Sequence, residues 1–182
     1  MEALPTFRYH PDPVATGSVR PNESTPCLAC NRIRDYIYVG PAYSEMFHYL
    51  SGCLCPWCIA DGSAAKQFRA TFADTGLMDG VSGQVRDTAG ARTPGFEAWQ
   101  QEEWLTCCGD CAAFLGAAGA PELKQSFPEA IPAVTAYVKE NYGLEGEELE
   151  EFVSGLSKND QPTAYVFRCL HCQRHLAYVD QT

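Results

Sequence analysis

Ten cysteines constrain the fold of this 182-residue chain more than any other feature. Eight of them form four Cys-x-x-Cys pairs, which are Cys27/Cys30, Cys55/Cys58, Cys108/Cys111 and Cys169/Cys172. The other two, Cys53 and Cys107, each lie beside a pair. In a secreted protein such a count would indicate disulfides, whereas in a reducing compartment paired thiols at this spacing favour metal binding.

Two cysteines separated by two residues can direct both sulfur atoms at one metal ion about 2.3 Å away. Two such pairs complete a tetrahedral site of four thiolates, and zinc is the expected metal because it accepts thiolates without redox chemistry. The four pairs therefore predict two Zn²⁺ sites. A redox-active dithiol, which needs an exposed sulfur with a lowered pKa, is the alternative.

The surroundings of each pair suggest how the pairs combine. Cys27/Cys30 lie in a predicted turn and Cys55/Cys58 at a predicted helix start, an arrangement that resembles a treble-clef zinc site. The same reasoning joins Cys169/Cys172, in a turn, with Cys108/Cys111, before the segment 112–119 that reads as a short helix. His171 or His175 could replace a thiolate in the second site, and Cys107 could substitute for Cys108, although exposed hairpin residues are the favoured interpretation of the two histidines.

The remaining pattern predicts an α+β fold with zinc-ribbon or treble-clef-like sites, short strands, β-hairpins and several short helices. A strand is expected at 35–39 and a helix from 60 to about 72. Residues 73–95 read as a loop, with a short strand near Val85. Helices are expected at 129–142 and 146–156, and a β-hairpin with a metal-binding turn closes the chain.

The same pattern suggests a domain division. An N-terminal zinc-binding lobe would span residues 1–75. A C-terminal helical lobe, closed by the hairpin, would span 76–182. One compact domain is the alternative, since 182 residues fit either arrangement.

The charge balance limits the classes of partner. The formal net charge of −10, from 23 acidic and 13 basic side chains, disfavours direct contact with nucleic acid, because phosphate contacts need Lys and Arg. An acidic surface suits a basic protein partner, or serves only for solubility. The sequence has neither a long apolar run nor the features of a secretory signal, so we expect a cytoplasmic protein that does not enter the membrane.

Other residues give weaker functional indications. The acidic stretch 143–151 is a candidate protein contact or a solvated helix face, and Trp99 with Trp104 is a candidate anchor or part of the core. His10, Asp12 and Asp61 could line a catalytic pocket, which would make the chain a zinc-containing hydrolase or another enzyme. No nucleophile elbow, P-loop or dinucleotide motif is present, and four thiolates leave zinc no open position, so a non-enzymatic role is favoured.

Several stretches carry a resemblance to a known family. They are LPTFRYHPDPVATGSV (4–19), YVGPAY (38–43), CPWCIADGSAA (55–65), RTPGF (92–96), residues 99–110 and FRCLHC (167–172). Together they resemble the CbrC family of bacterial proteins over nearly the whole chain. The resemblance implies tolerance of, or immunity to, a bacteriocin such as a DNase-type colicin. A toxin is then the expected protein partner. The alternative role, which follows from the cysteine thiols and not from the resemblance, is that of a thiol-dependent redox adaptor.

Overall fold

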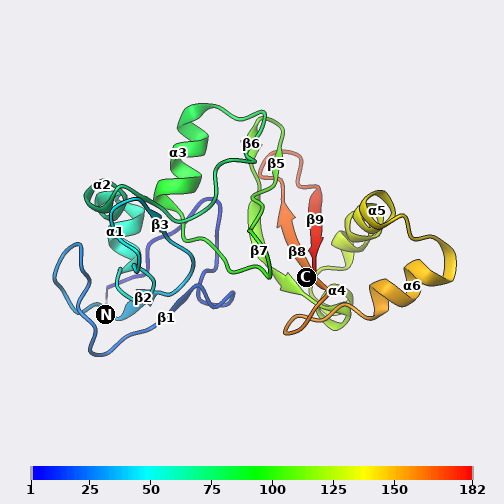
Figure 1. The fold of residues 1–182 in the computed structure, drawn as a ribbon, viewed down its shortest axis with the longest axis horizontal. Helices are drawn as coiled ribbons and strands as arrows, with labels where there is room; N and C mark the ends of the chain where they lie inside the picture. Colours follow the sequence, from blue (N-terminus) through cyan, green and yellow to red (C-terminus); the bar gives the residue numbers. More distant parts are fainter. Residues whose placement is uncertain (1, 182) are drawn as a thin grey trace.

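The structure, a computed structural model, describes residues 2–181. The first half of the chain forms short elements joined by loops (Figure 1). In chain order these elements are β1 (Val19–Pro21), β2 (Tyr36–Tyr38), β3 (Tyr43–Ser44), α1 (Pro56–Ala60), α2 (Ser63–Phe68), β4 (Ala70–Thr71) and α3 (Gly83–Arg92). β1 pairs with β2 and β3 with β4, both antiparallel.

The second half contains longer strands and helices. They are β5 (Thr106–Cys107), β6 (Asp110–Cys111), β7 (Ala113–Ala118), α4 (Ala120–Gln125), the 3₁₀ helix η1 (Pro128–Ala130), α5 (Ile131–Tyr142), α6 (Gly146–Ser154), β8 (Thr163–Arg168) and β9 (His175–Asp180). β5 and β6 form a short hairpin, while β8 lies between β7 and β9 and is antiparallel to both.

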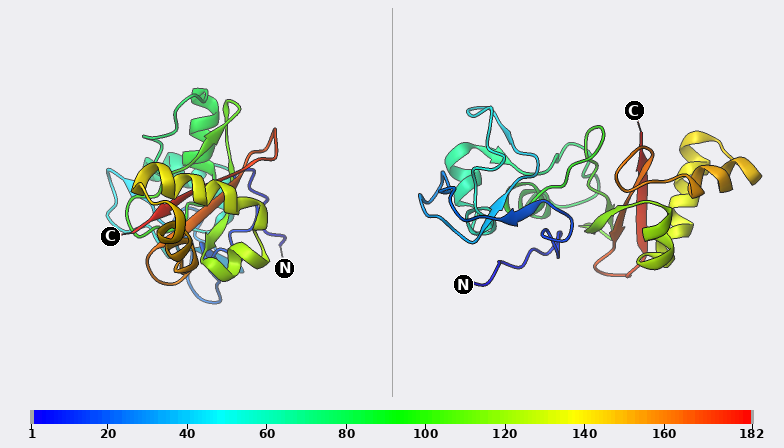
Figure 2. Two further views of the ribbon diagram at one scale, coloured as in Figure 1. Left: turned by 90° about the vertical axis from the view of Figure 1, so that its right-hand side faces the viewer. Right: turned by 90° about the horizontal axis from the view of Figure 1, so that it is seen from below.

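The three-stranded sheet β7–β8–β9 is buried on both faces. Successive side chains of a strand point to opposite faces, and β8 follows this rule. Ala164 and Val166 pack with the helices α4 to α6, whereas Tyr165 and Phe167 pack with aromatic residues on the other face. Figure 2 shows the sheet between those helices and the first half of the chain.

A separate apolar core stabilises the first half of the chain. It includes Tyr38, Leu54, Ile59 and Phe72, whose side chains are fully buried. Cys27, Cys55 and Cys58 belong to the same core, so this part of the fold is built around sulfur as well as hydrocarbon. Any group bound by these cysteines would be shielded from water on most sides.

The structure confirms the α+β class with short strands, hairpins and several helices. The expected helices at 129–142 and 146–156 correspond to α5 and α6, and the expected closing hairpin is β8–β9. The expected helix from 60 to about 72 is shorter than predicted, because α2 ends at Phe68 and the chain turns through Arg69, whose φ is 46°.

Three expectations for the middle of the chain are wrong. Residues 112–119 do not form a helix but contain strand β7, which pairs with β8. For the same reason Cys108 and Cys111 do not open a helix and lie instead in the β5–β6 hairpin. The segment 73–95 is not only loop, since it contains α3, which is capped by the Ser82 side chain accepting from Val85 N–H at 3.3 Å.

α3 also bears on the expected division into lobes. It follows residue 75 in the chain, yet it packs against α1 and β4 of the first half as well as against β6 of the second. The boundary between residues 75 and 76 stays a prediction.

Candidate metal centres

The first cysteine group joins a turn to the start of a helix. Cys27 and Cys30 lie in the turn between β1 and β2, Cys55 is the N-cap of α1, and Cys58 lies within that helix. All four sulfur atoms lie within 4.8 Å of one another, and the Cys30 and Cys55 Sγ atoms are 3.9 Å apart. Pro56 begins the helix, and its restricted φ suits a first helical position.

The second cysteine group joins two hairpins. Cys107 and Cys108 lie at the β5–β6 turn, and Cys169 and Cys172 lie in the turn between β8 and β9. These four sulfur atoms also lie within 4.8 Å of one another. The Cys107 Sγ is 3.7 Å from the Cys108 Sγ and 3.8 Å from the Cys172 Sγ.

These spacings can be compared with a tetrahedral thiolate site. Metal–sulfur bonds of about 2.3 Å place the ligand sulfurs of a regular tetrahedron roughly 3.8 Å apart. The three sulfur–sulfur distances given above span 3.7 to 3.9 Å. The donor atoms of both groups are therefore arranged as a zinc ion with four thiolates requires.

The turns 27–32 and 169–174 have the same backbone design. In each, the N–H of the first cysteine donates to the carbonyl five residues later, at 2.9 Å. The N–H four residues later donates back to the carbonyl of that cysteine, at 2.7 Å in the first turn and 3.2 Å in the second. The residue after the second cysteine, Asn31 or Gln173, has a positive φ of 55° or 62°.

Hydrogen bonding favours the thiolate form of the first cysteine in each turn. The pKa of Cys27 falls to about 4, chiefly through its hydrogen bond with the Cys55 side chain, and the Cys55 N–H also donates to the Cys27 Sγ at 3.2 Å. Burial acts to raise the pKa of Cys169, but N–H groups of Cys172 and His171 outweigh it and lower that pKa to about 6. Thiolate is the form that binds metal.

Seven of the eight cysteines expected as ligands lie in the two groups, and the eighth, Cys111, does not. Cys107 takes its place beside Cys108, whereas the sequence suggested Cys107 only as a substitute for Cys108. Cys111 is fully buried, and its Sγ lies 3.9 Å from the Met78 Sδ in the aromatic core. The reason is the hairpin, since the β5–β6 turn directs the sulfurs of Cys107 and Cys108 toward the β8–β9 turn and leaves Cys111 facing the core.

Neither histidine considered as a replacement ligand belongs to the second group. His171 is exposed, and its Nε2 lies 2.9 Å from the Asp110 Oδ2. His175 begins β9, where it pairs with Arg168. Among residues 2–181, both groups consist of cysteines alone.

A buried carboxylate beside the second group ties the start of the chain to it. Asp110 Oδ1 accepts from the Tyr9 hydroxyl at 2.7 Å, and Oδ2 accepts from Arg8 Nη2 at 2.6 Å, next to His171. Burial acts to raise the pKa of Asp110, but these hydrogen bonds outweigh it and lower the pKa to about 2. Spacing along the sequence does not reveal this cluster, because Asp110 is 101 residues from Tyr9.

The two groups differ in exposure to solvent. In the first, Cys27, Cys55 and Cys58 are buried and Cys30 is half-buried. In the second, only Cys169 is buried, whereas Cys108 and Cys172 are exposed. The second group is therefore open to solutes that the first excludes.

The residues considered for catalysis are engaged in local structural hydrogen bonds. His10 is buried between aromatic rings, its Nδ1 lying 2.7 Å from the Pro94 carbonyl and its Nε2 2.7 Å from the Thr16 hydroxyl. Asp12 accepts from Ala15 N–H at 2.9 Å in a loop, and Asp61 accepts from Ser63 N–H at 2.8 Å after α1. The two aspartates stabilise local turns, and His10 belongs to the core.

The two tryptophans considered as an anchor have different surroundings. Trp104 is buried, and its indole N–H donates to the Ala112 carbonyl at 2.9 Å. Trp99 is 42% exposed, and its indole N–H donates to the Thr163 hydroxyl at 2.7 Å. Trp104 is thus a core residue, while part of Trp99 faces solvent.

The fold and the two cysteine groups define an α+β protein with two four-cysteine groups suited to metal ions. The profile described as "Uncharacterised protein family (UPF0167)" matches residues 4–181. The chain belongs to the UPF0167 family.

Relatives from two bacterial genera support this assignment. The UPF0167 protein Mb2317 of Mycobacterium bovis is 48% identical over 181 residues, which are 98% of this chain and 94% of the relative. The UPF0167 protein PA1536 of Pseudomonas aeruginosa is 42% identical over 172 residues, which are 93% of this chain and 92% of the relative. No solved structure matches the chain.

The helices of residues 2–181 were also compared with the requirements of a membrane span. None of them combines the length and the apolar composition that crossing a bilayer needs.

Proposed function

We propose that this protein is a non-enzymatic zinc protein of the cytoplasm that acts by binding another protein. Two four-thiolate centres stabilise its fold, and the bound partner is a bacteriocin or nuclease toxin, so that the protein confers tolerance or immunity. The observation that carries the zinc assignment is the sulfur–sulfur spacing of 3.7 to 3.9 Å within the two cysteine groups.

The ligand chemistry supports a structural role for the metal. A tetrahedral zinc ion with four thiolates has no position left for water or substrate, in contrast to catalytic zinc sites with three protein ligands. The two turns also carry hydrogen bonds that pre-form thiolate at Cys27 and Cys169. In this role the metal joins segments that are distant in sequence.

The charge supports a basic protein partner. The chain carries a net charge of −10, and α6 exposes four glutamates, Glu147, Glu148, Glu150 and Glu151. A nuclease has a cationic surface for nucleic acid, which an acidic protein can cover. The resemblance of the chain to the CbrC family supports a toxin as this partner.

Metal analysis tests the first part of the proposal. Protein purified without chelator should contain about two zinc ions per chain, measured by inductively coupled plasma mass spectrometry. Protein with neither zinc nor another metal would contradict the structural role of the cysteine groups.

A binding measurement tests the second part. Purified colicin-type DNase domains, mixed with the zinc-loaded protein, should form a complex detectable by isothermal titration calorimetry and weakened by salt. Cells lacking the gene should be more sensitive to such a toxin. Equal sensitivity, together with no complex for any DNase domain tested, would contradict toxin binding while leaving the zinc result intact.

A redox-responsive adaptor is the second candidate, and it rests on the exposure of Cys108 and Cys172. Mild oxidant would then form a disulfide in the second group and release its zinc, with two thiolates each losing one electron to the oxidant. Titration of free thiols and of released zinc in parallel tests this candidate. Zinc retained at a peroxide concentration that oxidises an exposed model thiol would contradict it.

A further inference from the structure

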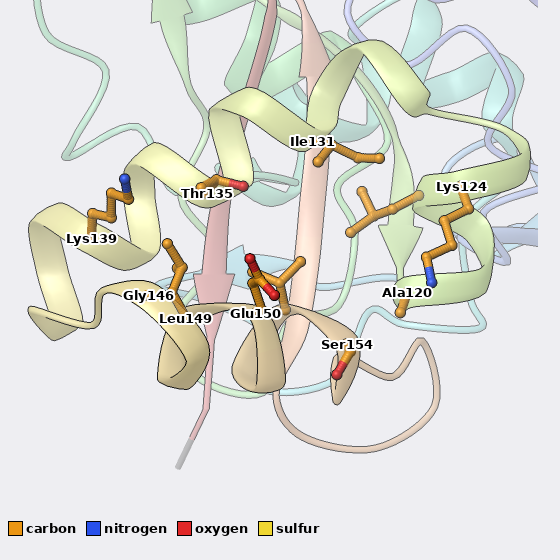
Figure 3. A pocket seen from close by; sticks show the side chains of 11 residues that line it. Ala120, Lys124, Ile131, Thr135, Lys139, Gly146, Leu149, Glu150 and Ser154 are labelled. Atoms are coloured by element: carbon orange, nitrogen blue, oxygen red, sulfur yellow. The ribbon is translucent and has the colours of Figure 1, made fainter.

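A groove opens between α4, α5 and α6 on the side of these helices that faces away from the sheet (Figure 3). It has a volume of about 480 Å³, and its apolar lining includes Leu123, Ile131, Leu149 and Val153. Neither cysteine group lies in it. The groove is therefore independent of the metal centres.

Two helices line the groove with regularly spaced residues. α5 contributes Ile131, Thr135 and Lys139, which lie one turn apart along a single stripe. α6 contributes five residues from Gly146 to Ser154 at positions i, i+3, i+4, i+7 and i+8, which lie on one face of the helix. The α5 stripe alone extends over about 12 Å, enough for roughly two turns of another helix to lie alongside.

The charges of the groove indicate what would occupy it. Figure 3 shows the Glu150 side chain rising from α6 between the helices, with Lys139 toward one end of the groove and Lys124 toward the other. None of these three charges takes part in an ion pair among residues 2–181. A complementary ligand would carry an apolar stripe, a cation opposite Glu150 and acidic groups near its ends.

We propose that the groove binds an amphipathic helix of a protein partner with this charge pattern. A helix placed in an apolar groove through residues at i, i+3, i+4 and i+7 is a recurrent mode of recognition. Glu150 favours this occupant over a fatty acid, whose hydrocarbon chain would cover the carboxylate without supplying a cation. The inference rests on the proposed role in protein binding and names the kind of segment recognised.

A designed peptide tests the groove on the full-length, zinc-loaded protein. The probe is a fluorescein-labelled helical 14-mer with leucines at i, i+3, i+4 and i+7, one arginine beside them in the central turn, and one glutamate in each terminal turn. Its net negative charge removes any general attraction to the acidic protein. Fluorescence anisotropy should show saturable binding with a Kd of roughly 1 to 100 µM.

Two charge-reversal variants give a matched comparison. Glu150→Lys places a cation opposite the peptide arginine and should weaken binding about fivefold or more. Glu148→Lys makes the same charge change on α6 outside the groove lining and should leave the Kd within about twofold. Val153→Gln should also weaken binding, and a peptide of the same composition with its leucine spacing scrambled should not bind.

Several outcomes would overturn the helix proposal. The first two are a probe that shows no saturable binding and an equal effect of Glu148→Lys and Glu150→Lys on its Kd. The third is displacement of the probe by dodecanoate, which would indicate a fatty-acid site. The fourth is a free protein that sediments as a dimer and is dissociated by Glu150→Lys, which would indicate a second copy of the chain as the occupant. The same variants are measured for zinc content and for binding of DNase toxin. If the peptide does not bind but the toxin does, the groove proposal is contradicted and the proposed function stands. If the toxin does not bind, the proposed function itself is contradicted.

Discussion

Cys107 and Cys111 lie on the two strands of one hairpin, yet their sulfur atoms have different surroundings. The Cys107 Sγ lies within 3.8 Å of two other cysteine sulfurs, whereas the Cys111 Sγ contacts the buried thioether of Met78. Burial raises the pKa of Cys111 to about 12, which keeps this thiol protonated. We therefore expect Cys107 to bind metal and Cys111 to serve as a small core residue.

Substitution of these two cysteines distinguishes the roles. Cys107→Ser should reduce the zinc content from about two to about one per chain, because the second centre loses a thiolate. Cys111→Ala should keep about two zinc ions and lower the free energy of unfolding by roughly 1 kcal/mol through lost packing. Mass spectrometry of the native proteins gives both stoichiometries, and zinc lost from Cys111→Ala but kept by Cys107→Ser would reverse the assignment.

His10 makes stability depend on pH. Burial lowers the pKa of His10 to about 4 in the folded protein, against about 6.5 in the unfolded chain. Between these values the unfolded chain binds a proton that the folded protein does not, so the free energy of unfolding falls as the pH falls. The contribution lost between pH 6.5 and pH 4 is at most about 3 kcal/mol.

The variant His10→Gln tests this pH dependence. Its glutamine cannot take up a proton, so urea unfolding of this variant should show a smaller loss of stability from pH 6.5 to pH 4 than the wild type shows. His48→Gln removes an exposed histidine and is the control, and acid effects on the metal centres are common to all three proteins. Equal pH slopes for the wild type and His10→Gln would show that His10 is not the cause.

At the scale of elements, the turns 27–32 and 169–174 depend on a left-handed residue after the second cysteine. Gln173 has a φ of 62°, a conformation that glycine adopts freely and β-branched residues avoid. Gln173→Val should therefore lower the free energy of unfolding by about 1 to 2 kcal/mol, while Gln173→Gly should be tolerated. Thermal unfolding of the two variants compares them, and equal midpoints would argue against strain at this position.

The elements also show how much of the fold the sequence could predict. α5, α6 and the β8–β9 hairpin carry apolar residues at the period of their own structure, so they were predicted correctly. α3 buries only Ala89 and Gly90 and has no apolar stripe to reveal it. β7 is rich in alanine, which favours helix, but pairing with β8 between two buried layers overrides that propensity.

The candidate site was predictable to a similar extent. The Cys-x-x-Cys spacing located six of the eight grouped cysteines, because two of the turns and one helix start use that spacing directly. It also located Cys108, but paired it with Cys111 instead of Cys107. Cys107 was predicted only as a substitute for Cys108, because the segment after Cys111 was read as a helix and the β5–β6 hairpin was not foreseen. The Asp110 cluster depends on contacts across more than 100 residues, which no local pattern records.

At the scale of the whole molecule, one cysteine group lies within a core and the other near the surface. Cys27, Cys55 and Cys58 pack with the apolar core of the first half, whereas Cys108 and Cys172 are exposed. A chelator should therefore remove one equivalent of zinc quickly and the second slowly, because release from the first centre requires its core to open.

A chromogenic chelator measures both phases, with circular dichroism followed in parallel. The fast phase should leave most secondary structure in place, and the slow phase should coincide with loss of the first-half core. Cys107→Ser should lack the fast phase. Release of both equivalents in one step would show that the two centres open together.

The order in which the ligands are synthesised differs between the two centres. Cys27 to Cys58 emerge from the ribosome close together, but Cys107 precedes Cys169 by 62 residues. At about 5 to 20 residues per second, this interval lasts roughly 3 to 12 seconds. A nascent chain therefore carries the thiols of Cys107 and Cys108 without their partners until Cys169 and Cys172 have been synthesised, and cellular zinc supply and oxidation act on them during that time.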